Sequence, residues 1–149
     1  MRRTFGVLLV FLSTLGLPHL GSAQDGAGGV ESGQQESGFE LQQNYPNPFN
    51  PETTVPFMLH IGLFDEGQPV VVSMRIYNVL QVLVAVPVAL RHPAGEGTPL
   101  LELEYTSPGR YEAFWDGKNR SGREVPSGVY HVQLTVNGVS KVGRMFVAK

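Results

Sequence analysis

The densest group of potential metal ligands lies in residues 115–130, which read WDGKNRSGREVPSGVY. The oxygen-bearing side chains that could bind a calcium ion are Asp116, Asn119, Ser121 and Glu124. Their spacing misses the alternation of the familiar calcium loop, and three bases among them would repel the ion. We favour a turn in which Asp116 accepts backbone N–H bonds. Residues 119–121 also form a glycosylation sequon, a short pattern with many chance matches.

Other residue types that commonly do chemistry form no comparable group. The histidines downstream of residue 23 are His60, His92 and His131. No two of them lie at metal-ligand spacing, and by strand phase His60 and His131 point to solvent. No serine lies in a nucleophile elbow, and no glycine run precedes a helix as a phosphate cradle requires. We therefore expect no enzymatic activity, no metal and no cofactor.

A cell-surface adhesion or carbohydrate-binding module of the same fold is the main alternative that the residues leave open. Such modules usually display a platform of exposed aromatic rings. Tyr77 and Phe114 have outward phase, whereas the single tryptophan, Trp115, has inward phase and is expected in the core. The sequence thus offers two scattered rings rather than a platform.

Charge is distributed unevenly along the chain. Residues 24–109 contain two bases against ten acids, whereas residues 110–149 contain seven bases against three acids. No basic cluster with interleaved aromatic residues occurs, so nucleic-acid binding is not expected. The basic part could meet an anionic surface, although a solvated sheet face is the simpler interpretation.

Residues 1–23 have the pattern of a secretory signal peptide. Two arginines precede the apolar stretch 5–17, and Gly21 and Ala23 are the small residues before a predicted cut at Gln24. The stretch is too short to span a bilayer, and no later apolar run is long enough. The chain has no cysteine, so it can form no disulfide and offers no lipid-accepting thiol. Its stability must come from one apolar core.

The 126 residues after the cut (149 minus 23) divide into a linker and one domain. Residues 24–38, QDGAGGVESGQQESG, cannot bury enough apolar surface to offset their ordering entropy. Over residues 39–149 the apolar residues recur with period two, and turn signals separate about seven short segments. This pattern predicts an all-β fold, an antiparallel immunoglobulin-like β-sandwich.

The alternation also predicts which side chains face the core. The inward rows are Val55, Phe57 and Leu59; Val72, Met74 and Ile76; Leu101, Leu103 and Tyr105; Tyr111, Ala113 and Trp115; and Tyr130, Val132, Leu134 and Val136. Pro56 cannot donate to a ladder, so strand 53–60 is expected at a sheet edge. Residues 81–90 are predicted as a strand interrupted at Pro87.

A two-residue hairpin is predicted at Asn137-Gly138, before a last strand at 139–147. That turn places Lys141 opposite Leu134, on the inner face. Either Lys141 lies at the rim and extends its amine to solvent, or the loop is longer than the dipeptide implies.

Proline shapes the segment before the first long strand. The block consists of Asn44, Tyr45, Pro46, Asn47, Pro48, Phe49, Asn50 and Pro51. Its three prolines remove three donors and favour extended geometry in the residues that precede them. We expect the asparagines to cap backbone groups, and Tyr45 and Phe49 to anchor the segment on the core.

This block, followed by Thr53-Thr54-Val55, resembles the start of the C-terminal sorting domain of type IX secretion cargo. That domain is similar to the Ig-like domain of flagellar hook-capping proteins. The resemblance covers residues 39–149. It is strongest over residues 109–130, where Trp115-Asp116-Gly117 and Ser127-Gly128-Val129-Tyr130 match a family turn and strand start. Gln81 departs from it, because the family usually has glycine in that turn.

The resemblance implies a non-enzymatic module that directs the protein to the outer membrane for export or surface display. The expected route is passage across the inner membrane by its secretion machinery, transit through the periplasm, and recognition by an outer-membrane translocon. The candidate recognition residues, by resemblance and charge, are Lys141, Arg144 and Lys149. The expected location is the outer-membrane surface or the extracellular medium, with no transmembrane span after processing.

Two further expectations follow from the resemblance. Hook-capping proteins reach their site through the flagellar channel rather than with a cleaved signal, so the leader argues against a flagellar role. Only a 15-residue linker separates the leader from the sandwich (24–38). We therefore expect a free-standing version, a shortened gene product, or a small surface protein that uses the module itself.

Overall fold

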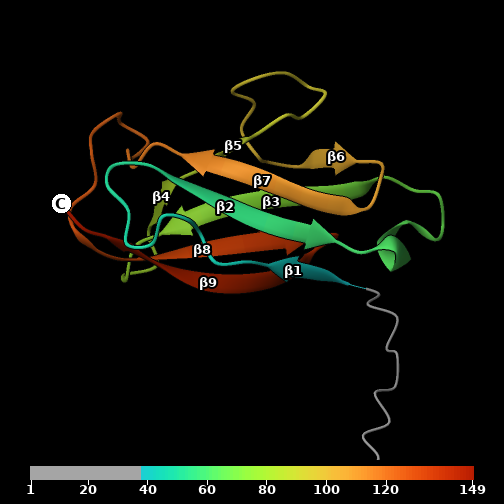
Figure 1. Ribbon diagram of the computed structural model, residues 1–149, viewed down its shortest axis with the longest axis horizontal. Coiled ribbons are helices and arrows are strands. Elements are labelled where there is room, and N and C mark those ends of the chain that lie inside the picture. Colours follow the sequence, from blue (N-terminus) through green and yellow to red (C-terminus); the bar gives the residue numbers. More distant parts are fainter. Residues whose placement is uncertain (1–37) are drawn as a thin grey trace, which may run out of the picture. The chain divides into compact units, whose positions relative to one another are not determined.

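The computed structural model describes residues 38–149 (Figure 1). The predicted signal peptide and all but the last residue of the predicted linker lie outside the described residues. The strands are β1 (Phe39–Leu41), β2 (Thr53–Leu59), β3 (Val70–Tyr77), β4 (Leu83–Ala85), β5 (Val88–Ala89), β6 (Leu103–Tyr105), β7 (Gly109–Trp115), β8 (Gly128–Val136) and β9 (Val139–Val147). One 3₁₀ turn, η1 (Ile61–Phe64), accompanies them. No helix in the described range is long and apolar enough to cross a membrane.

The strands form two antiparallel sheets that stack face to face (Figure 1). The four-stranded sheet has the order β1-β2-β7-β5, and the five-stranded sheet has the order β4-β3-β8-β9 with β6 beside β3. An immunoglobulin constant domain pairs its first, second, fifth and fourth strands in one sheet and its third, sixth and seventh in the other. The order here matches that arrangement when β4 and β6, which both pair with β3, are left out of the count. The predicted antiparallel β-sandwich is confirmed, with nine strands because short segments add to the seven expected.

Side chains that alternate inward from both sheets fill the core. The largest fully buried side chains of the strands are Phe57, Leu59, Met74, Ile76, Leu134 and Met145, and Phe49 and Leu100 join them from segments between strands. The predicted inward rows on β2, β3, β7 and β8 are confirmed, with only Tyr111 remaining partly exposed.

One inward row was predicted with the wrong phase. Leu101 is 43% exposed, whereas Leu100 is fully buried. The backbone turns at Glu102, where φ is 52°, so the alternation of β6 does not extend back through that residue. The carbonyl of Leu100 instead accepts a 2.8 Å hydrogen bond from the Met74 amide.

The prediction that β2 lies at a sheet edge is wrong, because β2 pairs with β1 on one side and β7 on the other. The carbonyl of Pro56 faces the β1 side, where it accepts a 3.0 Å bond from the Gln42 amide. The nitrogen of a strand residue points to the same side as its carbonyl. The Pro56 nitrogen, which has no hydrogen to donate, therefore faces the side where β1 has just ended. All hydrogen bonds between β2 and β7 are kept.

The interruption predicted at Pro87 is the point where the chain changes sheets. Residues before it, in β4, pair with β3, and residues after it, in β5, pair with β7. A proline at such a crossing removes no ladder bond.

The hairpin at Asn137-Gly138 is confirmed, with Val136 opposite Val139 and positive φ at both turn residues. Lys141 lies opposite Leu134, as that register requires. Its ammonium group donates to the carbonyl of Phe39 and lies 4.7 Å from the centre of the Phe39 ring. The lysine thus uses its long chain to reach β1 at the open side of the sandwich.

Candidate functional site

The three segments that carry the family resemblance meet at one end of the sandwich. Phe49 of the proline block is buried, and its ring centre lies 5.4 Å from that of Trp115. Trp115 in turn lies 5.7 Å from Tyr130, and both pairs have edge-to-face geometry. Such pairs add stability beyond the area that they bury. The predicted anchoring of the block by Phe49 is confirmed.

The proline block runs parallel to the end of β9 and is hydrogen-bonded to it. The Phe49 amide donates to the Phe146 carbonyl at 2.9 Å, and the Ala148 amide donates to the Phe49 carbonyl at 3.1 Å. The side chain of Asn47 accepts a 3.1 Å bond from the Phe146 amide. Residues 146–148 are therefore fixed by the block as well as by β8.

Asn44 organises the beginning of the block from a buried position. Its side-chain amide donates to the Pro46 carbonyl at 3.1 Å and to the Thr53 hydroxyl at 2.9 Å. Thr53 also donates to the Pro46 carbonyl at 3.0 Å. Capping of backbone groups by asparagine, as predicted, is thus confirmed for Asn44 and Asn47.

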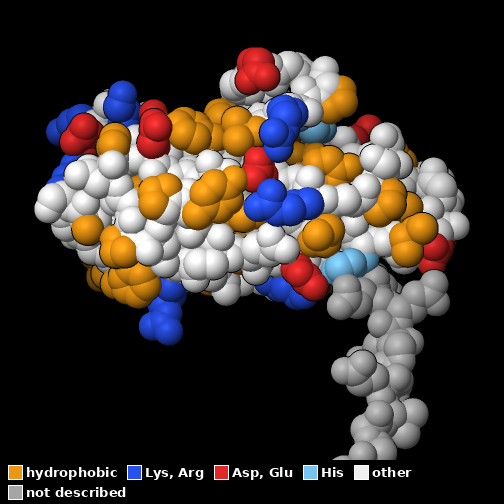
Figure 2. Space-filling model, in the orientation of Figure 1, with side chains coloured by type: hydrophobic (Ala, Val, Ile, Leu, Met, Phe, Trp, Pro, Cys, Tyr) orange, Lys and Arg blue, Asp and Glu red, His pale blue; other side chains and the backbone are white. Residues whose placement is uncertain are grey.

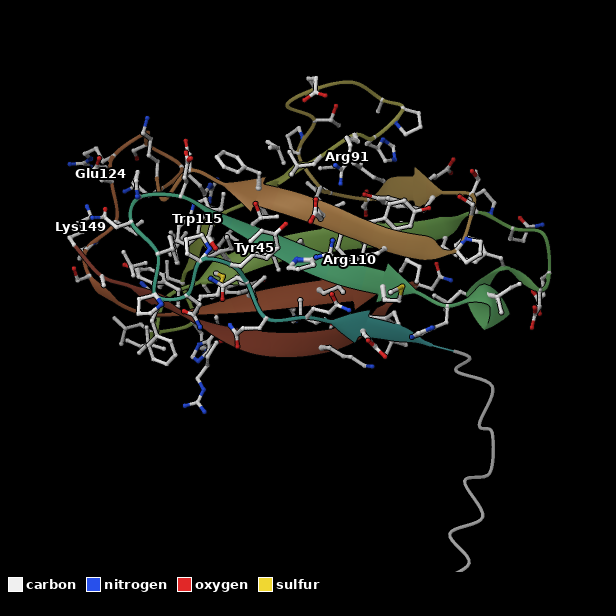
Figure 3. All side chains as sticks on the ribbon, viewed as in Figure 1. Tyr45, Arg91, Arg110, Trp115, Glu124 and Lys149 are labelled. Atoms are coloured by element: carbon white, nitrogen blue, oxygen red, sulfur yellow. The ribbon has the colours of Figure 1, made fainter. Side chains whose placement is uncertain are left out.

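The prediction that Tyr45 anchors the block in the core is wrong, because its side chain is 48% exposed. The Tyr45 hydroxyl (Tyr45 is labelled in Figure 3) donates instead to the carboxylate of Glu112, on the outer face of β7. That carboxylate also accepts bonds from Arg91 at 2.7 Å and from Arg110 at 3.0 Å. The Tyr45 hydrogen bond, with help from both arginines, holds the pKa of Glu112 below its ordinary value despite burial.

The Trp115-Asp116-Gly117 turn packs directly under the proline block. Gly117 has a φ of +73°, and a Cβ added there would lie 2.0 Å from the carbonyl oxygen of Pro51. The indole N–H of Trp115 donates to the Lys118 carbonyl at 2.9 Å. Asp116 accepts a 3.0 Å bond from the Lys118 amide, which confirms the predicted turn. Only glycine satisfies both the backbone angle and the close approach.

A second capping residue, which the sequence reasoning missed, closes the same turn. The Asn119 side-chain oxygen accepts 3.0 Å bonds from the amides of Ser121 and Arg123. Two of the oxygens weighed as calcium ligands therefore serve the backbone, and Glu124 pairs with Lys149 at 2.9 Å. Within residues 38–149 no group of three or more histidine, cysteine or acidic side chains could hold a metal ion. The local signal for such a cap is an asparagine in a short turn that glycines bound, here Asn119 between Gly117 and Gly122.

Tyr130 completes the cluster at the start of β8. Its hydroxyl donates to the Pro126 carbonyl at 2.9 Å, four residues upstream. A tyrosine in this position, bonded back to the preceding corner, is typical of immunoglobulin-like sandwiches. Gly128 has a φ of +155°, a backbone angle that residues with a side chain rarely adopt. The Ser127 hydroxyl accepts a 3.1 Å bond from the Lys149 amide.

The three candidate recognition bases do not share one surface. Lys141 points to the inner side and is bonded to β1. Arg144 lies on the outer face and is exposed. Lys149 is paired with Glu124 at the end of the sandwich (Figure 3). The structure thus leaves Arg144 as the one base of the three whose side chain makes no bond within residues 38–149.

The histidines hold structural positions rather than forming a group. His92 accepts a 3.1 Å bond from the Ala94 amide through Nδ1, so Nε2 carries the proton and donates to the Glu104 carbonyl at 3.0 Å. His60 lies 3.4 Å from Glu40 with a side chain 18% exposed. The expectation that His60 points freely to solvent is therefore wrong.

The two outward aromatic rings lie on different sheets. Tyr77 belongs to β3 of the five-stranded sheet and Phe114 to β7 of the four-stranded sheet. Both side chains are partly buried. They therefore form no common platform of the kind that a carbohydrate-binding module displays.

No family model and no curated protein matches the sequence. Among solved structures, the chain is similar to dimeric latent PorU from Porphyromonas gingivalis, with 20% identity, 74% of this chain and 9% of that chain covered, and a TM-score of 0.49. It is also similar to PorZ, described as an essential bacterial surface component of the type-IX secretion system of the same organism, with 20% identity, 81% and 13% covered, and a TM-score of 0.44. The chain spans about a tenth of the length of those two chains. With identities of 20% and TM-scores below 0.5, these likenesses carry no argument about function.

Proposed function

We propose that residues 39–149 form a non-enzymatic sorting or surface-display module, which an outer-membrane secretion machinery recognises after the chain has crossed the inner membrane. The observation that carries the proposal is the convergence of the resemblance segments on residues 146–149. The proline block, the Trp-Asp-Gly turn and the Ser-Gly-Val-Tyr segment either bond to those residues or pack against the block that does. Segments far apart in sequence thus build one structural unit.

This arrangement suits recognition because it holds the last strand in one conformation. Residues 146–148 are bonded to the block, and Lys149 is bonded to Ser127 and Glu124. A surface that is already ordered loses little conformational freedom on binding, which favours affinity and specificity. The side chains that stand out from this strand, with Arg144 first, are the proposed contacts of the translocon.

The lack of enzymatic activity is part of the proposal. The buried carboxylate of Glu112 accepts bonds from Tyr45, Arg91 and Arg110, and its lowered pKa keeps it ionised near neutral pH. An ionised carboxylate that is already held by three donors, two of them arginines, is a poor general acid or base. Its geometry is that of a clamp between the proline block, the loop after β5, and β7.

The test is a fusion of residues 39–149 behind a signal peptide and a reporter, in a host that has a type IX translocon. We expect the reporter outside the cell, and retention in the periplasm would contradict the proposal. Arg144→Gln should lower export, whereas the matched Arg75→Gln, on the same sheet face but on β3, should not. Equal export by both variants would reject the last strand as the contact while leaving the sorting role intact.

A further inference from the structure

The outer face of the five-stranded sheet carries no acidic side chain on β4, β3, β8 or β9. Residues 70–90 and 125–149, which contain these strands, include no aspartate or glutamate. They do include Arg75 and Arg144, whose outward side chains form no ion pair with any described residue. β6 belongs to the same sheet, and its Glu104 lies opposite Val71 at the start of β3. The unpaired positive charge is therefore confined to the part of the face around Arg75 and Arg144.

The same face exposes apolar side chains. Leu80 is 78% exposed, Val142 62% and Phe146 42%. Register places Val142 in line with Arg75 across β8, and Arg144 in line with Tyr77. Along the lower left margin of Figure 2, below β9, hydrophobic and basic side chains lie next to one another. We call Arg75, Tyr77, Leu80, Val142, Arg144 and Phe146 the basic-apolar face.

The turn that carries Leu80 is held by hydrogen bonds to Asn78. The Asn78 side-chain oxygen accepts 3.0 Å bonds from the amides of Leu80 and Val82, and the Asn78 carbonyl accepts a 3.0 Å bond from Gln81. Turns of this kind normally carry polar residues. Here the backbone holds an almost fully exposed leucine away from the core, which contributes nothing to folding.

The turn and β9 border one shallow hollow on this face. Its volume is about 270 Å³, and it is lined by Tyr77, Gln81, His131, Gln133 and Val142. Pockets for small ligands are usually larger and enclosed by apolar walls. The hollow shows that Leu80's turn bends over the same face as Val142, but it does not fit a small-molecule site.

We propose that the basic-apolar face docks on an anionic lipid surface, with Leu80 and Phe146 entering the headgroup layer and Arg75 and Arg144 meeting lipid phosphates. A second copy of this chain is disfavoured because two basic-apolar faces, each with two arginines, repel each other. A folded partner needs a continuous apolar patch as the centre of its interface. Here His131 and Gln133 separate the apolar side chains, and a fluid lipid surface accepts such separated contacts. The face shares Arg144 with the proposed translocon contact, but a vesicle assay contains no translocon, so the two proposals can fail separately.

The test is co-sedimentation of purified chain (residues 24–149) with vesicles of phosphatidylcholine alone, and with vesicles of equal parts phosphatidylcholine and phosphatidylglycerol. We expect binding to the anionic vesicles only, weakening as salt screens the charges. Arg75→Gln/Arg144→Gln should lower the partition coefficient roughly 30-fold, because each base near an anionic surface contributes about fivefold. The control Lys118→Gln/Arg123→Gln removes the same charge from the 116–127 turn and should have little effect.

Matched apolar variants test the inserted side chains. Leu80→Ser should weaken binding about tenfold, whereas Ile61→Ser, a 60% exposed residue of η1, should not. Val142→Ser should weaken it and Val139→Ser should not, since the two valines are equally exposed on opposite faces of β9. Equal losses in variants and controls would overturn the proposal. A wild-type chain that binds neither kind of vesicle would overturn it as well. Self-association of that chain in sedimentation would then assign the face to a protein partner.

Discussion

Replacing Gly117 by alanine isolates the contact between the proline block and the Trp-Asp-Gly turn. Alanine at a φ of +73° pays a conformational cost of about 1–2 kcal/mol. Its Cβ would also lie 2.0 Å from the Pro51 carbonyl oxygen, so the block must move away. That movement endangers the two backbone bonds between Phe49 and β9, each contributing about 1 kcal/mol. We therefore expect Gly117→Ala to cost about 3–4 kcal/mol of unfolding free energy.

Gly122→Ala is the matched control, five residues away in the same turn. Gly122 has a φ of +76°, and no atom lies within 4 Å of an added Cβ. It should therefore show the conformational cost of about 1–2 kcal/mol alone. The assay is urea unfolding followed by the fluorescence of Trp115, the single tryptophan. Equal midpoints and slopes for the two variants would refute the close contact, and with it the physical reason for the two segments to occur together.

Three further perturbations test other parts of the account. Trp115→Ala should cost about 3–5 kcal/mol in urea melts followed by circular dichroism, because it empties the space between two buried rings, and a loss below about 1 kcal/mol would show an exposed ring. Gln81→Gly should raise the unfolding free energy by up to about 1 kcal/mol, because Gln81 has a φ of 60°, and a less stable variant would contradict that backbone angle. The lowered pKa of Glu112 stabilises the fold fully above the unfolded pKa of about 4.3, and this contribution is lost as pH falls through the folded pKa. The stability advantage of wild type over Glu112→Gln should therefore shrink in acid urea melts, and a gap independent of pH would argue against an ionised clamp.

Much of the fold could be predicted because the alternation of apolar residues is regular over the long strands. On β8, for example, Val132 and Leu134 are buried as the alternation predicts. The hairpin at Asn137-Gly138 then fixes how β8 pairs with β9. The prediction for Leu101 failed where a residue with positive φ breaks the alternation, and sequence gives no signal for a glutamate in that conformation. The prediction for Pro56 failed because a missing donor has a cost only if a neighbouring strand needs it.

The candidate site could be predicted only in part, for a related reason. The turn dipeptides and Phe49 have local signals, and the structure confirms their positions. Tyr45, Arg91 and Glu112 are far apart in sequence, and their meeting depends on how the loop after β5 folds over β7. No spacing rule predicts such a contact. The side-chain positions of the two lysines likewise depend on partners far away in sequence. Lys141 bonds to Phe39, and Lys149 bonds to Glu124.

The sorting role is tested most directly by measuring the fraction of a reporter fused to residues 39–149 that external protease can reach in intact cells. The measurement is made in paired strains that differ only in a functional type IX translocon. The account predicts a protease-accessible reporter in the strain with the translocon and a protected, periplasmic reporter in the strain without it. Equal protection in both strains would contradict the account.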